Sequence, residues 1–155
     1  MANIEWHCKP FSELSNDQLY ELIKLRIDIF VVEQTCPYTE LDDKDRDNQT
    51  HHLMGYEAGT LLAYARLLPP GLRYSNSSIG RFAVLLARRK QGIGTQLMQQ
   101  CITSIAKLWP KTAISISAQQ QLQNFYQDFG FKKESDVYHE DGIPHIDMLL
   151  VEDIH

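Results

Sequence analysis

Residues 88–95 read Arg88-Arg89-Lys90-Gln91-Gly92-Ile93-Gly94-Thr95 and join two different sequence patterns. The apolar run 79–86 precedes them and predicts a β-strand. The apolar positions after it recur at spacings of three or four residues and predict a helix over 93–108; they are Ile93, Leu97, Cys101, Ile105 and Leu108. Residues 88–95 are therefore predicted to form a glycine-containing turn between a strand and a helix.

This turn has the features of an anion-binding site. The first N–H groups of a helix lack intrahelical partners, and the helix dipole favours negative charge at that end. Gly92 and Gly94 let a phosphate approach the backbone without meeting a side chain. The basic residues 88–90 add positive charge. We therefore predict that the turn binds the pyrophosphate of a cofactor.

Two common phosphate-binding motifs do not fit the turn. The dinucleotide fingerprint requires a third glycine where this chain has Leu97, and an acidic residue about twenty positions later. The ATP-type loop requires Gly-Lys-Ser/Thr, which the sequence does not contain. The pattern that remains is Arg89-x-x-Gly92-x-Gly94.

Length and composition restrict the class of protein. A chain of 155 residues, 43% of them hydrophobic, is long enough for a substantial core, and we expect one domain over 1–155. The net charge of -5 argues against nucleic acid or an anionic membrane as a partner. We find no membrane-spanning run and no secretory signal pattern at the start. Cys8, Cys36 and Cys101 are widely spaced and odd in number, which favours reduced cysteines and a cytoplasmic location.

The other patterns predict an α/β fold with a mixed sheet. Ser15, with Gln18 three positions later, marks a helix start, and Pro37 blocks continuation of that helix. Gly59 and Asp141-Gly142 predict hairpin turns. The predicted strands are 4–8, 50–56, 61–68, 79–86, 113–117, 131–138 and 143–151, and the predicted helices are 15–34, 93–108 and 119–129. This order favours an α+β arrangement with a mostly antiparallel sheet flanked by helices.

An acid-rich segment, 39–48, is predicted to be a loop. It does not match a calcium-binding loop, because the required glycine and bidentate glutamate are missing from their positions. Two interpretations remain, a solvated acidic loop or a negative rim that attracts a cationic amine. Arg66 and Arg81 stand in apolar strands. Long charged side chains are seldom buried without a partner, so they either line a substrate cleft or pair with Glu33 or an acid of this loop.

A second motif lies downstream of the turn, Asn124-Phe125-Tyr126-Gln127-Asp128-Phe129-Gly130-Phe131. In this order, the two motifs resemble the acyl-CoA loop and the Tyr/Gly-Phe segment of the GNAT superfamily of N-acyltransferases. Further segments extend the resemblance to ElaA-type GNAT proteins of bacteria over nearly the whole chain; they are Phe30–Tyr38, His52, Gln119–Tyr126 and Glu140–Ile146. The resemblance implies the GNAT fold, with acetyl-CoA as co-substrate and no metal.

The resemblance also assigns roles residue by residue. The strand whose backbone receives the acetyl carbonyl and the pantetheine arm is matched by Phe82, Ala83 and Val84. The pyrophosphate loop is matched by Arg89, Lys90, Gln91, Gly92, Ile93, Gly94 and Thr95. Gln119 stands where many members have an Asn that touches the cofactor. Tyr126 matches the tyrosine that protonates the leaving thiolate.

A general base is harder to place. Many GNAT enzymes carry a glutamate on the fourth or fifth strand, but the polar residues there are Ser78, Ser115 and Ser117. A neutral imidazole suits the task near pH 7. Besides a chain of water molecules, the candidates are His52 as first choice, His145 as second, and Glu33. The histidines show no metal-binding pattern.

We therefore expect an N-acetyltransferase that moves the acetyl group from the thioester to a primary amine by direct attack in a ternary complex. The acceptor is a small amine or a protein amino group, and the acidic loop favours a cationic one. A ping-pong route through Cys36 or Cys101 lacks a local histidine partner. Two rivals are a non-catalytic acyl-CoA-binding module and a nucleotide-binding regulator. Exposed sheet edges leave a homodimer open.

Overall fold

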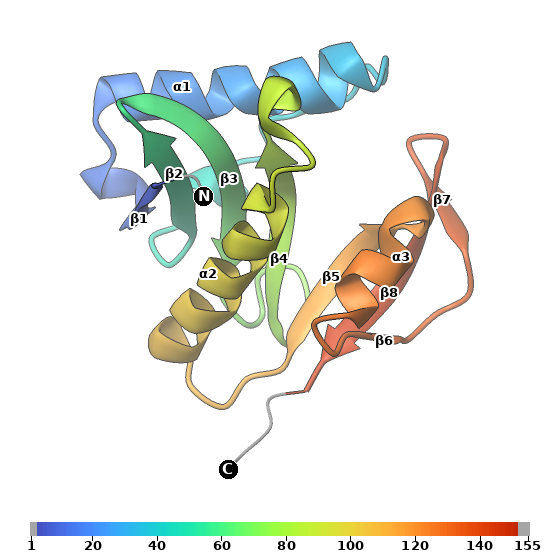
Figure 1. Ribbon diagram of the computed structural model, residues 1–155. Helices are drawn as coiled ribbons and strands as arrows, with labels where there is room; N and C mark the ends of the chain where they lie inside the picture. The colour runs from blue at the N-terminus through green and yellow to red at the C-terminus, as the bar shows by residue number, and fades with distance from the viewer. Residues whose placement is uncertain (1–2, 152–155) are drawn as a thin grey trace.

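The computed structural model describes residues 3–151 and contains a mixed sheet with helices on both faces (Figure 1). The strands are β1 Glu5–Pro10, β2 His51–Glu57, β3 Thr60–Leu68, β4 Ser77–Val84, β5 Ile114–Gln119, β6 Lys132–Lys133, β7 Tyr138–Glu140 and β8 Ile143–Leu150. The helices are α1 Asn16–Arg26, α2 Ile93–Leu108 and α3 Gln123–Gln127. A π-helical segment, η2 Ile27–Glu33, continues α1, and the short 3-10 turns are η1 Phe11–Glu13, η3 Lys44–Arg46, η4 Leu86–Arg88 and η5 Gln120–Leu122.

The sheet has the mostly antiparallel arrangement that the sequence predicts. Its eight described strands follow the order β1-β2-β3-β4-β5-β8-β6, and β7 also pairs with β8. Only the β4–β5 pair is parallel among the pairs within residues 3–151. The predicted strand 131–138 is wrong in detail, because it is divided into β6 and β7. Between β6 and β7, the Asp147 N–H donates to the Ser135 hydroxyl at 2.9 Å instead of to a backbone carbonyl of a paired strand.

Alternating side chains on β2 and β3 separate two apolar cores. Leu53 and Ala63 belong to the core under α2, whereas their neighbours Met54 and Tyr64 belong to the core under α1. Successive side chains of a strand point to opposite faces. Helix α1 therefore covers one face of the sheet and α2 the other (Figure 1). None of the helices that the structure describes is long and apolar enough to cross a membrane.

The predicted helix start at Ser15 is confirmed. The Ser15 hydroxyl accepts from the Gln18 N–H at 3.0 Å, and the Gln18 side chain accepts from the Ser15 N–H at 3.0 Å. The predicted helix 119–129 is too long, since α3 covers only Gln123–Gln127. Gln119 is instead the last residue of β5, where it pairs with His145 of β8 in extended conformation.

Both predicted hairpin turns are confirmed. Ala58 and Gly59 have φ angles of 49° and 82° between β2 and β3. Asp141 and Gly142 have φ angles of 51° and 78° between β7 and β8. Two successive positive φ angles are typical of the type I′ turn, whose twist matches that of the two strands.

The sheet opens between β4 and β5. These strands pair only at their starts, through Ser77 with Ile114 and Ser78 with Ser115. Beyond that point they diverge (Figure 1). A bulge in β4 accompanies the divergence, because Arg81 has a φ of 50° and the register with β3 shifts there. Residues from both halves of the sheet line the resulting opening.

The acid-rich segment 39–48 folds against the sheet. Glu40 and Asp45 are each 6% exposed. The buried Arg26 guanidinium donates to Glu40 at 2.8 Å and to Asp45 at 2.7 Å. Arg66 also donates to Asp45, and Arg81 donates to Glu40. Guanidinium groups therefore neutralise these two acids. For Glu40 and Asp45, the interpretation as a solvated loop and the interpretation as a negative rim are both wrong. Pairing of Arg66 and Arg81 with this segment is confirmed.

Candidate active site

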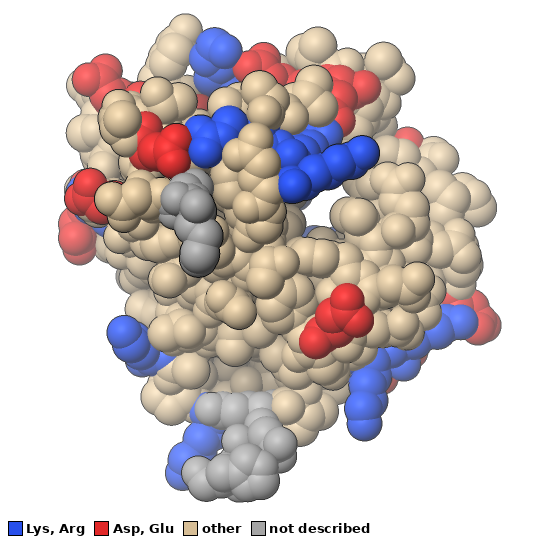
Figure 2. Space-filling view, in the orientation of Figure 1, with Lys and Arg blue, Asp and Glu red and all other residues tan. Residues whose placement is uncertain are grey.

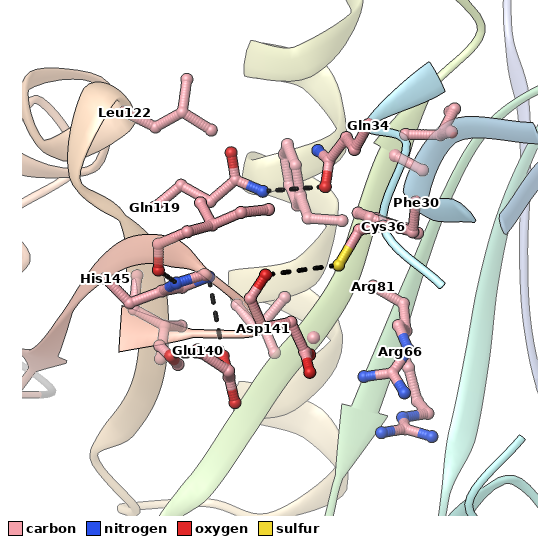
Figure 3. Close-up of a pocket in the computed structure, with 18 of the residues that line it drawn as sticks. Phe30, Gln34, Cys36, Arg66, Arg81, Gln119, Leu122, Glu140, Asp141 and His145 are labelled. Carbon is pink, nitrogen blue, oxygen red and sulfur yellow. Dashed lines mark hydrogen bonds and ion pairs between the residues drawn. The ribbon is translucent and has the colours of Figure 1, made fainter. Parts of the chain in front are cut away.

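A cavity of about 650 Å³ lies in the opening between β4 and β5. Its lining combines residues of the turn before α2, the edge of β4, the β7–β8 hairpin, and Asp42 with Arg66. Figure 2 shows this face of the molecule hollowed beside a group of basic side chains, and Figure 3 shows the lining residues. The volume is in the range of small-molecule sites.

The predicted pyrophosphate turn has a backbone that needs glycine. Gly92 has a φ of 80°, in the left-handed region, and it directly precedes the first residue of α2. Ile93 is 1% exposed and packs in the core under α2. Of the predicted turn residues, the cavity is lined by Arg89, Lys90 and Gly94, whereas Gln91, Gly92, Ile93 and Thr95 are outside the lining.

Glu33, a candidate base, pairs with this turn. The Arg89 guanidinium donates to its two carboxylate oxygens at 2.6 and 2.8 Å. Arg89 Nε also donates to the Val84 carbonyl at 3.1 Å, which holds the guanidinium beside the end of β4. The Glu33 carboxylate is therefore the ion-pair partner of a cation in the predicted pyrophosphate turn.

The end of β4 faces the cavity. Ala83 and Val84 pair with Tyr64 and Ala63 of β3 along one edge of the strand. On the other edge, β5 has already diverged, and Phe82, Ala83 and Val84 all line the cavity. Backbone N–H groups on such an open edge can stabilise an oxyanion.

Tyr126 of α3 lies between the aromatic core and the cavity. It is 7% exposed, lines the cavity, and packs edge-on against Phe82, Phe125 and Phe131. Burial raises the pKa of this phenol. The group therefore stays protonated.

Two hydrogen bonds cross the cavity and join residues 34–36 to the C-terminal half of the chain (Figure 3). Gln119 Nε2 donates to Gln34 Oε1 at 3.4 Å. The Cys36 thiol donates to the Asp141 carbonyl at 3.4 Å. Gln119 also lines the cavity, and its amide ties β5 to the end of η2.

His145 of β8 lines the cavity and is 8% exposed. Its Nδ1 lies 2.7 Å from the Ile143 carbonyl. A carbonyl oxygen only accepts, so Nδ1 carries a hydrogen, and in the neutral imidazole Nε2 has the lone pair. Nε2 lies 3.6 Å from Glu140 Oε2, and the ring stacks on Tyr138. This geometry suits a proton acceptor.

His52, the first-choice base, is a structural residue. It is fully buried and does not line the cavity. Its Nε2 lies 3.0 Å from the Asp45 carbonyl, and its Nδ1 lies 2.6 Å from the Tyr64 hydroxyl. Nε2 must therefore donate and Nδ1 must accept, which leaves no lone pair for a substrate. Burial also lowers the pKa of this imidazole. The prediction of His52 as the base is corrected on these grounds.

Glu140 lines the cavity and is not among the predicted catalytic residues. It is on β7 rather than on the fourth or fifth strand, and it reaches Ser117 of β5 at 3.3 Å. The predicted Asp141-Gly142 turn is the sequence signal that brings Glu140 back beside His145. No group of three or more His, Cys, Asp or Glu residues suited to a metal ion occurs in the described part of the chain.

The open β4 edge, the glycine turn at a helix N-terminus and the buried tyrosine in one cavity define an acyltransferase of the acyl-CoA-using type. Residues 22–151 match the family model described as the acetyltransferase (GNAT) domain. The chain thus belongs to the GNAT acetyltransferase family, whose members use acyl-CoA, and it is ElaA-like within that family.

The similarity extends over nearly the whole chain. Protein ElaA of Escherichia coli is 44% identical over 145 residues, which cover 94% of this chain and 95% of ElaA. The crystal structure of E. coli ElaA has a TM-score of 0.90 at 43% identity and covers 95% of this chain and 99% of that chain. An acyl-CoA N-acyltransferase from Pseudomonas aeruginosa has a TM-score of 0.92 at 44% identity, with 96% and 100% covered.

Proposed function

We propose that this protein transfers an acetyl group from acetyl-CoA to a primary amine by direct attack in a ternary complex. The observation that carries the proposal is the single cavity that joins the phosphate turn, the open edge of β4 and Tyr126. One continuous cavity lets both substrates meet without a covalent enzyme intermediate. We infer that residues 1–155 form one such domain.

We assign each step of the transfer to residues of this chain. The turn at Arg89–Thr95 binds the pyrophosphate through N–H groups and basic side chains. Backbone N–H groups at Phe82–Val84 stabilise the oxyanion when the amine nitrogen bonds to the acetyl carbon. His145 Nε2 accepts the proton that the amine loses. When the C–S bond breaks, the Tyr126 hydroxyl gives its proton to the thiolate sulfur.

The thiols support direct attack. Cys101 is fully buried, and burial raises its pKa well above the usual range, which makes it a poor nucleophile. Cys36 lines the cavity, but its thiol donates to the Asp141 carbonyl. All three cysteines are free, which supports a reducing compartment and hence the cytoplasm.

The proposed acceptor is a small amine or a protein amino group. Because Glu40 and Asp45 are paired with arginines, a cationic acceptor must pair with carboxylates on other walls of the cavity.

A homodimer is consistent with the strand edges at β1 and β6, which end the sheet order. Sedimentation analysis of the purified protein tests it.

The test of the function has two stages. Calorimetric titration with acetyl-CoA, CoA and ATP comes first, and we expect selective binding of the CoA compounds. An amine panel with detection of released CoA thiol comes second. Binding without consumption across the panel would assign the protein to non-catalytic acyl-CoA-binding modules. Absence of acetyl-CoA binding by the folded protein would refute the proposal.

A further inference from the structure

We propose that Ser117, Glu140 and His145 form the binding site for the acceptor's ammonium group. This inference rests on the proposed acetyl transfer and names the site that holds its second substrate. The three side chains come from β5, β7 and β8 and line the same wall of the cavity. Figure 3 shows Glu140 and His145 side by side on that wall.

The carboxylate of Glu140 is at the centre of the three groups. Its Oε2 atom lies 3.3 Å from Ser117 Oγ and 3.6 Å from His145 Nε2. The other oxygen, Oε1, lies 3.4 Å from Arg73 Nη2. All three separations are longer than a strong charge-assisted hydrogen bond. The carboxylate therefore keeps most of its capacity to accept.

The hydrogen atoms of the neighbouring hydroxyl groups are already used. Tyr138 Oη lies 2.7 Å from Asp147 Oδ1 and 2.5 Å from Ser117 Oγ. Each of these short contacts needs one hydrogen, and Asp147 is acceptor-only when ionised. The Tyr138 hydrogen therefore points to Asp147, and the Ser117 hydrogen points to Tyr138. No hydrogen remains between Ser117 Oγ and Glu140 Oε2.

Neutral His145 likewise has no hydrogen directed at Glu140. In the neutral form of His145, the single ring hydrogen is on Nδ1 and bonds to the Ile143 carbonyl at 2.7 Å. His145 Nε2 and Glu140 Oε2 then face each other as two acceptors. Ser117 Oγ and His145 Nε2 thus lie 3.3 and 3.6 Å from Glu140 Oε2 as acceptors, and Arg73 contacts only the other oxygen of this carboxylate. Facing acceptors repel unless a donor or a cation lies between them.

A primary ammonium group carries the charge and the N–H donors that these acceptor atoms require. It carries one positive charge for Glu140 and three N–H donors for the three acceptor atoms. Transfer of one of these protons through His145 Nε2 to solvent leaves a neutral amine with a lone pair for the acetyl carbon. His145 Nε2 then accepts the second proton, which the nitrogen loses when the amide forms, and Glu140 stabilises the imidazolium. The site therefore selects unhindered primary alkylammonium groups. A quaternary ammonium has no N–H donor and cannot satisfy it.

The binding test avoids the chemical step by using CoA in place of acetyl-CoA. Propylammonium is titrated into the CoA-saturated protein, and the ring signals of His145 are followed by NMR. We expect saturable shifts in the unsubstituted protein and in Glu134→Gln, a matched control at an exposed position outside the cavity. Glu140→Gln is expected to weaken binding by about tenfold or more, since a charged hydrogen bond is lost. Glu140→Asp should restore part of it.

The outcomes separate this site from the function on which it rests. Propyltrimethylammonium should leave the His145 signals unchanged. Equal propylammonium affinity in Glu140→Gln and Glu134→Gln would overturn the ammonium site, and so would unshifted His145 signals in the unsubstituted protein. If propylammonium binds as expected but no amine in the panel is acetylated, the ammonium site stands and the transferase proposal fails.

Discussion

Removal of the Glu33 charge should strengthen acetyl-CoA binding. Arg89 holds Glu33 through two bonds, at 2.6 and 2.8 Å, and each side chain is 33% exposed. A pyrophosphate at the turn must share or displace this carboxylate. Ion pairs at such exposure contribute up to about 1 kcal/mol, and the bidentate geometry places this pair near that limit. Glu33→Gln should therefore lower the Kd for acetyl-CoA about fivefold.

Calorimetry at two salt concentrations measures the effect, which should shrink as ionic strength rises. Glu57→Gln is a matched control, because Glu57 pairs with Arg88 of the same turn at 2.6 Å and is 30% exposed. Arg88 does not line the cavity, so this control should bind acetyl-CoA with unchanged affinity. Pantetheine, which lacks the pyrophosphate, should bind Glu33→Gln and the unsubstituted protein equally. Weaker acetyl-CoA binding in Glu33→Gln, or an equal gain in Glu57→Gln, would refute the reasoning.

Three further changes test other parts of the molecule. Tyr126→Phe should lower kcat by about 100-fold with the acetyl-CoA Kd unchanged, since the proton donor is lost and the ring is kept. Tyr20→Phe, at an exposed position, is the control. An unchanged kcat in Tyr126→Phe would remove Tyr126 from the mechanism. Incubation with acetyl-CoA without amine should add no acetyl group to Cys36, and an acetylated thiol in the intact mass would favour ping-pong transfer. Burial opposes ionisation of Asp42, but the hydrogen bonds and charge of Arg66 outweigh it and lower the Asp42 pKa to about 2. This stabilisation is therefore present above the unfolded pKa of about 4 and is lost as pH falls towards 2. Asp42→Asn should remove about 1–2 kcal/mol of unfolding free energy at pH 6 and much less near pH 2.5. Urea unfolding measures it against the exposed Asp43→Asn, and parallel pH curves for the two variants would contradict the assignment.

Features set by neighbouring residues could be predicted from the sequence. The helix predicted over 93–108 is α2, Ile93–Leu108, because its apolar period and its initial glycine are local signals. The cap at Ser15 and the positive φ angles at Gly59 and Gly142 are local in the same sense. The GNAT fold follows from the order of such elements together with the two motifs.

Features set by residues far apart in the chain could not be predicted from the sequence. Composition shows that segment 39–48 is acidic, but it does not show that Arg26 lies beside Glu40 and Asp45. The Arg66–Asp42 pair likewise joins β3 to a segment 24 residues away in the chain. These contacts require the folded sheet, and they convert a predicted solvated loop into a buried ionic cluster. Burial of a charge is determined by its partners, which a periodicity does not reveal.

The two histidines show why a residue type alone does not identify a base. His52 and His145 are both buried histidines on strands, and both have a ring nitrogen beside a backbone carbonyl. The difference is at the second nitrogen. His52 Nδ1 already accepts the Tyr64 hydrogen, whereas Nε2 of neutral His145 faces the Glu140 carboxylate at 3.6 Å. Because β7 turns back along β8, the hairpin brings Glu140 beside His145. In the proposed site, this hairpin supplies the two elements that amine activation needs: a negative charge from Glu140 and a lone pair from His145.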